Sequence, residues 1–251
     1  MISWLTTRPI AHRGLHGAPT GFVENTRSSC AAAVEAGFGI EVDLQLSADG
    51  AAMVFHDDTL DRLTASNGPL ATLTAAALRK VHFRATTDAM MTFGDLLALV
   101  RGRVPLLVEL KSRFDGDIRL AERAAAVAAD YAGPLAFMSF DPILVAALRR
   151  LVPAIPRGIT AERYYNDRSW DRLSPDEKRR LGNLLHLPQS RFQFVAFRVN
   201  DLPTRATWFV QHLLRMPLLT WTVRRPIDRA AAARYADQMI FEGFLPDRSD
   251  H

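Results

Sequence analysis

Two short segments of the chain carry charged residues spaced two positions apart, Glu41 with Asp43 and Glu109 with Lys111. The positions between and around them are apolar, which is typical of strands. Side chains at positions i and i+2 of a strand share one face. Each charged pair is therefore expected on one face of its strand, with apolar residues on the other. Buried carboxylates of this kind need cations or a metal ion to offset the cost of desolvation.

The carboxylates of Glu41, Asp43 and Glu109 form a hard, all-oxygen ligand set if their strands lie side by side. Such a set suits Mg²⁺ or Ca²⁺ rather than a metal that prefers sulfur. Exposure near a strand end is the alternative interpretation of each carboxylate taken alone. Three at one edge of a sheet favour the metal site.

Two histidines and two cations accompany these carboxylates. His12 ends the apolar run 8–12 and is followed by Arg13, and His56 follows a second apolar run. Imidazoles titrate near neutral pH, so the two histidines can serve as general acid and general base. Arg13 and Lys111 beside a metal site indicate an anionic substrate, for which phosphate is the first candidate.

The position of His56 can be predicted from a turn. The Asp-Gly pair at 49–50 separates the runs 38–46 and 51–56, and this pair is a strong signal for a hairpin. If the loop has two residues, Asp43 lies directly across from His56 on the same face of the sheet. A longer loop or a bulge would change this register, and a purely structural role is the alternative for a lone histidine.

The rest of the chain alternates apolar strand patterns with Ala-, Leu- and Arg-rich helical patterns, which predicts an α/β fold. The strand at 51–56 is antiparallel because four residues cannot form a parallel crossover. Eight parallel strands then remain, and eight strands in about 250 residues predict a (β/α)8 TIM barrel. We expect a single domain over 1–251 with an insertion at about 45–91. The expected strands are 8–12, 38–46, 51–56, 104–111, 134–139, 155–160, 193–199, 217–223 and 237–242, and the expected helices are 26–36, 73–80, 92–101, 117–131, 141–151, 174–187, 203–215 and 226–236.

Composition excludes several classes of protein. Of the 251 residues, 48% are hydrophobic and 23% charged, which is ordinary for a globular protein. The single cysteine, Cys30, excludes an intramolecular disulfide. Arginine accounts for all but three of the 31 basic residues, but they form no stripe, so we expect no nucleic-acid partner. No signal peptide or apolar span of membrane length is visible, so we expect a cytoplasmic protein with no stable membrane insertion. The sequence does not indicate an oligomeric state.

The motifs, taken in order, resemble the glycerophosphodiester phosphodiesterase family. Each one alone is a weak signal, whereas the ordered set covers almost the whole chain and is specific. The matching segments are His12-Arg13-Gly14, Glu24-Asn25-Thr26, Glu41-Val42-Asp43, Asp49-Gly50 with His56-Asp57, Thr59-Leu60-Asp61-Arg62, Val108-Glu109-Leu110-Lys111, Ser139-Phe140 and Trp221-Thr222-Val223.

The resemblance implies a (β/α)8 barrel that hydrolyses small glycerophosphodiesters to sn-glycerol 3-phosphate and an alcohol, with Mg²⁺ or Ca²⁺ as cofactor. The implied site residues are Glu41, Asp43 and Glu109 on the metal, His12 and His56 as general acid and base, Arg13 and Lys111 on the phosphate, Trp221 and Phe140 lining the glycerol or leaving-group pocket, and Glu24 and Asn25 organising the first loop. Core packing is the alternative role for Trp221.

Several alternatives stay open at this point. Either histidine can start as the base, and either the glycerol 2-hydroxyl or a water molecule can attack first. The alternative functions are a lysophospholipase D-type activity on the same scaffold and a non-catalytic barrel that binds glycerophosphodiesters or lipid headgroups. Two segments depart from the family pattern, the last strand with Glu242 and the Arg224-Arg225 pair after strand seven of the predicted barrel. An arginine at the mouth would favour anionic or hydroxyl-rich headgroups over choline.

Overall fold

A computed structural model describes residues 2–246, and its nine strands form one sheet in which eight are parallel. The first strand pairs with both the second and the last, so the parallel strands close into a barrel, which confirms the predicted TIM-barrel fold. The strands are β1 (Ile10–Ala11), β2 (Gly39–Leu46), β3 (Ala52–Val54), β4 (Leu106–Leu110), β5 (Leu135–Ser139), β6 (Arg157–Ala161), β7 (Phe194–Arg198), β8 (Leu218–Val223) and β9 (Gln238–Phe241).

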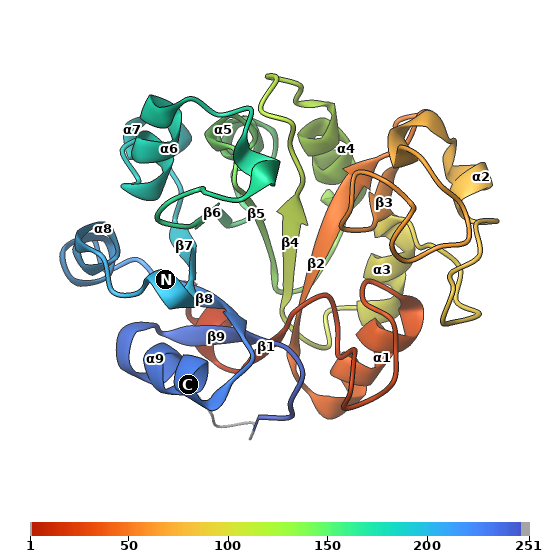
Figure 1. Cartoon of the computed structure of the whole chain (residues 1–251), viewed down its shortest axis with the longest axis horizontal. Coiled ribbons are helices and arrows are strands. Elements are labelled where there is room, and N and C mark those ends of the chain that lie inside the picture. The colour runs from red at the N-terminus through yellow and green to blue at the C-terminus, as the bar shows by residue number, and fades with distance from the viewer. Residues whose placement is uncertain (1, 247–251) are drawn as a thin grey trace.

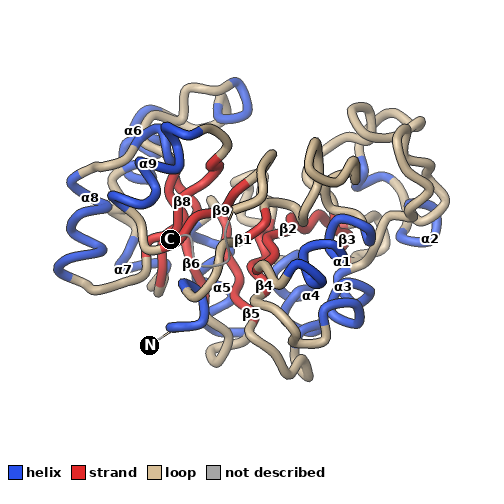
Figure 2. The backbone as a smooth tube through the Cα atoms, turned by 90° about the horizontal axis from the view of Figure 1, so that it is seen from below, coloured by secondary structure: helices blue, strands red, loops and turns tan. Residues whose placement is uncertain are grey.

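Helices surround the barrel on its outside (Figure 1), and Figure 2 shows the strands as the central layer between them. Several helices begin at a side chain that caps the first turn, such as Thr26, Thr92 and Ser174. No helix in residues 2–246 has the length and apolar character needed to span a bilayer. The α-helices are α1 (Arg27–Ala36), α2 (Ala75–Leu78), α3 (Phe93–Val100), α4 (Arg119–Ala128), α5 (Pro142–Leu151), α6 (Pro175–Gly182), α7 (Leu187–Ser190), α8 (Arg205–Trp208) and α9 (Pro226–Tyr235).

Three predicted helices are shorter or divided in the structure. In the segment 174–187, α6 ends at Gly182, and α7 begins at Leu187 as a separate turn with a proline near its start. Proline lacks an amide hydrogen and is favoured at the first helical positions, so it starts a new helix rather than continuing the old one. The segment 203–215 combines α8 with a π-helical turn at Phe209–Leu213, and 73–80 holds only α2.

Two apolar layers hold the barrel together. Inside it, Leu107, Met138 and Ile240 pack among the other inward side chains. Between the strands and the helices lies a larger layer that includes Val42 and Val108, both fully buried. Because Val42 and Val108 face the helices, the residues next to them on β2 and β4 face the inside of the barrel, as strand periodicity predicts.

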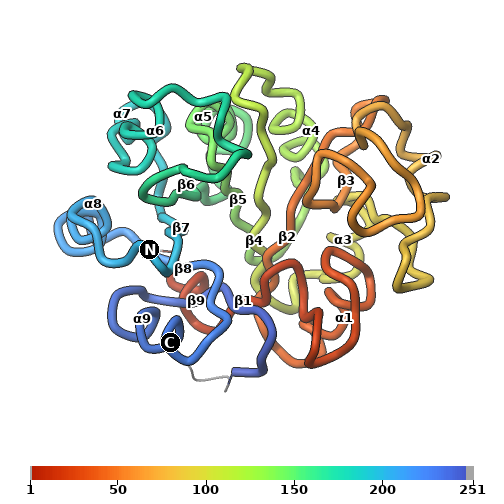
Figure 3. The backbone as a smooth tube through the Cα atoms, viewed as in Figure 1, coloured from red at the N-terminus to blue at the C-terminus, as the bar shows by residue number. Residues whose placement is uncertain are grey.

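The segment between β2 and α3 lies outside the ring of parallel strands (Figure 3). Its strand β3 is antiparallel to β2, as predicted, but Leu44 pairs with Val54 and Leu46 with Ala52. This register differs by one residue from the predicted one. The pairing of Asp43 with His56 is therefore wrong.

The turn explains the difference in register. The amide of Ser47 donates to the carbonyl of Ala51, so the loop holds three residues rather than two. Gly50 ends this loop with φ +75°, a left-handed conformation that glycine adopts without strain. Because β3 ends at Val54, the loop beyond the strand sets the position of His56.

Candidate active site

A cavity of about 610 Å³ opens at the carboxyl ends of the barrel strands. In a TIM barrel this is the end at which active sites are built. Nine of the residues that the sequence predicts for the site line this cavity, whereas Glu24 and Asn25 of the first loop are not among its lining residues. The nine residues are His12, Arg13, Glu41, Asp43, His56, Glu109, Lys111, Phe140 and Trp221.

The three predicted metal ligands form a compact cluster on the floor of the cavity. Asp43 of β2 is the direct neighbour of Glu109 in β4, and Glu41 lies two residues earlier on the same face of β2. One carboxylate oxygen from each lies within 4.8 Å of the others. The three residues are at most 5% exposed.

Two cations contact this cluster. Lys111 Nζ lies 2.7 Å from Asp43 Oδ1 and 2.5 Å from Glu109 Oε1, and Arg13 Nε lies 3.2 Å from Asp43 Oδ2. Burial opposes the charge of Asp43, but Lys111 and the other cations outweigh it and hold the pKa of Asp43 well below its usual value. Burial alone would lower the pKa of Lys111, whereas Asp43 and Glu109 raise it above the ordinary lysine value.

Within residues 2–246, no lysine or arginine forms an ion pair with Glu41, and its only neighbour of this kind is His12 at 4.0 Å. Glu41 accepts a hydrogen bond from the backbone amide of Arg13 at 3.0 Å. Burial, together with the charges of Asp43 and Glu109, raises the pKa of Glu41 well above its usual value. A divalent cation among the three carboxylates would supply the missing positive charge, and an all-oxygen donor set is the one that Mg²⁺ and Ca²⁺ prefer. The residues present therefore fit a hard metal ion.

His12 is held by a residue that the sequence analysis did not assign to the site. Its Nδ1 lies 2.7 Å from Oε2 of Glu242. Burial lowers the pKa of His12 to about 4, although the hydrogen bond to Glu242 opposes that shift. Glu242 follows β9, and Ala11 pairs with Phe241, so closure of the barrel puts the ends of the first and last strands side by side. The only feature of the sequence that pointed to a role for Glu242 was its departure from the family pattern.

His56 is held in a similar way by its neighbour in the chain. Its Nδ1 lies 2.7 Å from Oδ1 of Asp57, and Asp57 is paired with Arg62 at 2.6 Å. The side chain of Gln45 donates to the carbonyl of His56 at 3.0 Å. Each of the two predicted acid–base histidines therefore has a carboxylate on Nδ1 and a second ring nitrogen available for proton transfer.

The first loop supports the cluster, as the sequence predicts for Glu24 and Asn25. The amide of Asn25 donates to Asp43 Oδ2 at 2.9 Å. Glu24 accepts hydrogen bonds from Arg13 at 2.8 Å and from Arg62 at 2.9 and 2.7 Å. The loop thus fixes both a carboxylate of the cluster and the arginine beside it.

Aromatic side chains form one wall of the cavity. Phe140 packs against Trp221 with ring centroids 5.5 Å apart and against Trp170 at 4.8 Å. Phe114 packs edge-on against Trp170 with ring centroids 6.1 Å apart. Trp170 belongs to the long segment between β6 and α6, where no strand or helix pattern of the sequence indicated a place in the site.

The two arginines after β8 occupy different places. Arg224 lines the cavity and its Nη2 donates to Glu242 Oε2 at 3.0 Å. Arg225 pairs instead with Asp228, in the first turn of α9, at 2.8 Å. Of these two residues only Arg224 is in a position to meet a substrate.

Comparison with known proteins agrees with this geometry. The model of the glycerophosphoryl diester phosphodiesterase family matches residues 12–251. The chain belongs to that family. A glycerophosphodiester phosphodiesterase of Caldanaerobacter subterraneus is 36% identical over 107 residues, which are 42% of this chain and 40% of that relative. The matched stretch thus spans less than half of this curated relative.

Solved structures with the family fold cover nearly the whole chain. A phosphodiesterase of Oleispira antarctica, in complex with its product sn-glycerol 3-phosphate, has a TM-score of 0.77 at 19% identity and covers 96% of this chain and 94% of its own. A glycerophosphodiester phosphodiesterase of Thermotoga maritima has a TM-score of 0.69 at 20% identity, with 92% of each chain covered. At these identities the likeness to solved structures shows the fold alone. The candidate site rests on the carboxylate cluster and the two histidines of this chain itself.

Proposed function

We propose that this glycerophosphoryl diester phosphodiesterase family member hydrolyses glycerophosphodiesters to sn-glycerol 3-phosphate and an alcohol, with a divalent cation as cofactor. The observation that carries the proposal is the content of one cavity. It holds three buried carboxylates, two histidines that are each oriented by a further carboxylate, and two cations. A binding protein would not need two oriented imidazoles, whereas the cleavage of a phosphodiester needs a proton acceptor and a proton donor.

Glu41, Asp43 and Glu109 would hold the cation, Mg²⁺ or Ca²⁺. When bound, the cation supplies positive charge beside the phosphate, which stabilises the charge that develops on the phosphate oxygens. Arg13 and Lys111 lie against the same carboxylates and extend this positive charge toward the substrate. Arg13 and Lys111 would bind the phosphate in the cavity that both histidines line.

His12 and His56 carry the proton transfers. One imidazole takes the proton of the attacking hydroxyl, either the glycerol 2-hydroxyl or water, as the new bond to phosphorus forms. The other gives its proton to the oxygen of the departing alcohol as the old bond breaks. Glu242 and Asp57 hold the two Nδ1 atoms, so in both rings Nε2 is the nitrogen that exchanges protons.

Trp221 and Phe140 would line the pocket for the glycerol or leaving-group end of the substrate. The aromatic wall that they form with Trp170 also favours a second candidate, lysophospholipase D-type cleavage, because an acyl chain needs apolar surface beside the mouth. The substrate panel therefore has to include a lysophospholipid.

The test is the release of glycerol 3-phosphate from diesters of choline, ethanolamine, glycerol and inositol, and of lysophosphatidic acid from a lysophospholipid, with and without EDTA. Under the proposal the small diesters are cleaved and chelation abolishes turnover. His12→Ala and His56→Ala each lower kcat by roughly 10²–10⁴-fold, the usual contribution of general acid–base catalysis. Full turnover after exhaustive chelation contradicts the metal requirement, and near wild-type kcat in either variant contradicts the two-histidine mechanism.

A further inference from the structure

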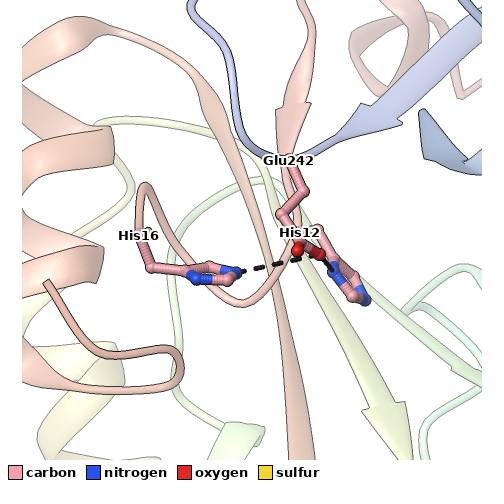
Figure 4. A group of neighbouring side chains, drawn as sticks. All are labelled: His12, His16 and Glu242. Carbon is pink, nitrogen blue, oxygen red and sulfur yellow. Dashed lines mark hydrogen bonds and ion pairs between the residues drawn. The ribbon is translucent and has the colours of Figure 1, made fainter. Parts of the chain in front are cut away.

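His12 has neighbours on both sides of its ring. On the side of the carboxylate cluster, Nε2 lies 4.0 Å from Glu41. On the other side, Nδ1 lies 2.7 Å from Glu242, and Nε2 of His16 approaches the same Glu242 oxygen at 3.9 Å. One ligand atom each from His12, His16 and Glu242 lies within 4.8 Å of the others. Figure 4 shows the ring of His16 directed toward the His12–Glu242 pair.

The proposed phosphodiesterase reaction does not use His16. This residue lies in the loop between β1 and α1, and its side chain is 11% exposed. Its Nε2 is buried and has no hydrogen-bond partner among the described residues. A separation of 3.9 Å from the Glu242 oxygen is too long for a hydrogen bond. Buried polar atoms in proteins nearly always have a partner, so this nitrogen requires an explanation.

We propose that His12, His16 and Glu242 bind a transition-metal ion of the Zn²⁺ type at a site separate from the three-carboxylate cluster. Two imidazoles and one carboxylate form the ligand set of many zinc sites, whereas Mg²⁺ prefers oxygen ligands alone. The ligand atoms of a tetrahedral zinc site lie about 3.3 Å apart, given bonds of about 2.0–2.1 Å. The separations of 2.7 and 3.9 Å lie on either side of that value.

Arg224 is the group that competes with the metal ion for Glu242. Its Nη2 donates to the same carboxylate oxygen at 3.0 Å. The Arg224 side chain is 54% exposed, so it can turn into solvent when an ion binds. The Nε2 of His16 then gains the partner that it lacks.

Binding at this site would stop the reaction, and this consequence rests on the proposed function. With the metal on Nδ1 of His12, the ring keeps one proton, and that proton is on Nε2. Such a ring has no lone pair with which to take a proton from the nucleophile. It is also a much weaker acid than imidazolium, so it cannot readily protonate the leaving alcohol. Whichever role His12 has, a Zn²⁺-type ion acts as an inhibitor that Mg²⁺ does not displace.

The first experiment measures metal binding and needs no activity. The wild-type protein, in a large excess of Mg²⁺ that fills the carboxylate cluster, is titrated with Co²⁺ while its visible absorption is recorded. We expect one equivalent of Co²⁺ to bind with the absorption of a four-coordinate nitrogen- and oxygen-ligated ion. Absence of such binding in the wild-type protein overturns the proposal whether or not any variant folds.

Variants then locate the ion. His16→Gln is expected to weaken Co²⁺ and Zn²⁺ binding by about 10-fold or more, since the loss even of a group outside the ligand set commonly costs that much. The matched control is His82→Gln, which removes an exposed histidine from the segment outside the barrel and should bind as the wild type does. Glu41→Gln should retain the Co²⁺ site. Wild-type affinity in His16→Gln, or loss of the site in Glu41→Gln, contradicts the proposal.

Inhibition is measured last, with Mg²⁺ saturating. Zn²⁺ should inhibit the wild type and His82→Gln at equal concentrations, whereas His16→Gln should turn over normally and need about 10-fold more Zn²⁺. Equal inhibition of all three proteins places the inhibitory ion elsewhere. If the protein has no phosphodiesterase activity, the proposed function fails while the binding experiment still decides the metal site.

Discussion

Removing the charge of Glu242 tests whether this residue positions and stabilises the His12 ring. Oε2 of Glu242 accepts from His12 Nδ1 at 2.7 Å and from Arg224 Nη2 at 3.0 Å. In Glu242→Gln, the amide can place either its oxygen or its nitrogen at that position. Because both neighbours are donors, the oxygen is favoured there, and the tautomer of His12 is preserved. What the variant loses is the negative charge that stabilises the imidazolium.

The size of the effect follows from the strength of this bond. Hydrogen bonds to charged groups contribute about 1.5–3 kcal/mol, and neutral ones about 0.5–1.5 kcal/mol. The loss of charge thus costs about 1–1.5 kcal/mol, which lowers kcat by about 10-fold at 1.36 kcal/mol per factor of ten. Glu242→Ala loses the whole bond, and kcat should fall by roughly 10–150-fold.

The double variant Glu242→Gln/Arg224→Ala makes the prediction sharper. Without Arg224, the amide of Gln can turn and donate to Nδ1, which moves the ring proton to Nε2. Replacement of a histidine-orienting carboxylate by an amide that imposes the wrong tautomer can cost up to about 10⁴-fold in kcat. The double variant should therefore be slower than either single variant, by more than the product of their effects.

The assay couples release of sn-glycerol 3-phosphate to glycerol-3-phosphate dehydrogenase at saturating substrate and Mg²⁺. Arg224→Ala alone is the control, because it leaves the Glu242 carboxylate on His12, and its kcat should stay within about 3-fold of wild type. Wild-type kcat in both Glu242→Gln and Glu242→Ala would refute the assignment of Glu242 as the residue that positions His12.

Three further predictions concern the metal, the headgroup and acid stability. Glu41→Gln should abolish the rise in Tm that Mg²⁺ gives the wild type. Without metal it should raise Tm, because it removes a buried carboxylate whose charge the nearby cations offset less than burial and the other carboxylates oppose it. An unchanged response of Tm to Mg²⁺ would contradict the ligand set. Arg224→Glu should increase hydrolysis of glycerophosphocholine relative to glycerophosphoinositol several-fold, because Arg224 lines the cavity. Arg225→Glu is the control and should not change this ratio, because Arg225 pairs with Asp228. An equal response of both substrates to both changes would show that neither arginine determines the headgroup preference. Burial lowers the pKa of His186 to about 4, so between pH 6.5 and 4 the unfolded chain takes up a proton that the folded chain does not. When the pH falls from 7.5 to 4.5, the free energy of unfolding of the wild type, measured in urea, should therefore decrease by about 2–3 kcal/mol more than that of His186→Leu. Equal decreases in the two proteins would contradict the lowered pKa.

The sequence alone determined which face of each strand carries the chemistry. In β2 polar and apolar residues alternate from Ile40 to Leu46, and at the end of β4 Glu109 and Lys111 alternate with Val108 and Leu110. Side chains two positions apart in a strand share one face, so these charged side chains lie on one side of the sheet and the apolar residues between them lie on the other. The barrel could also be predicted from the sequence. The four-residue turn before 51–56 is too short for a parallel crossover, so that strand is antiparallel and eight parallel strands remain. The motif order then indicated the family, which the match over residues 12–251 confirms.

Contacts between residues far apart in the chain were decided only by the tertiary structure. Glu242 meets His12 because the barrel closes β9 onto β1, and no local pattern encodes how the last strand of a closed sheet aligns with the first. Trp170 reaches the cavity from a long segment whose path is fixed by packing against Phe140 rather than by periodicity.

The position of His56 was also predicted only in part from the sequence. The Asp-Gly pair predicted a hairpin, but two- and three-residue loops share that signal, and the choice between them shifts the register by one residue. His56 nevertheless lines the same cavity as Asp43, because the loop after β3, held by Gln45 and Asp57, returns it to the barrel mouth. Side-chain periodicity is a local property of the backbone and can be read from the chain, whereas the meeting of loops and strand ends depends on the closure of the whole barrel.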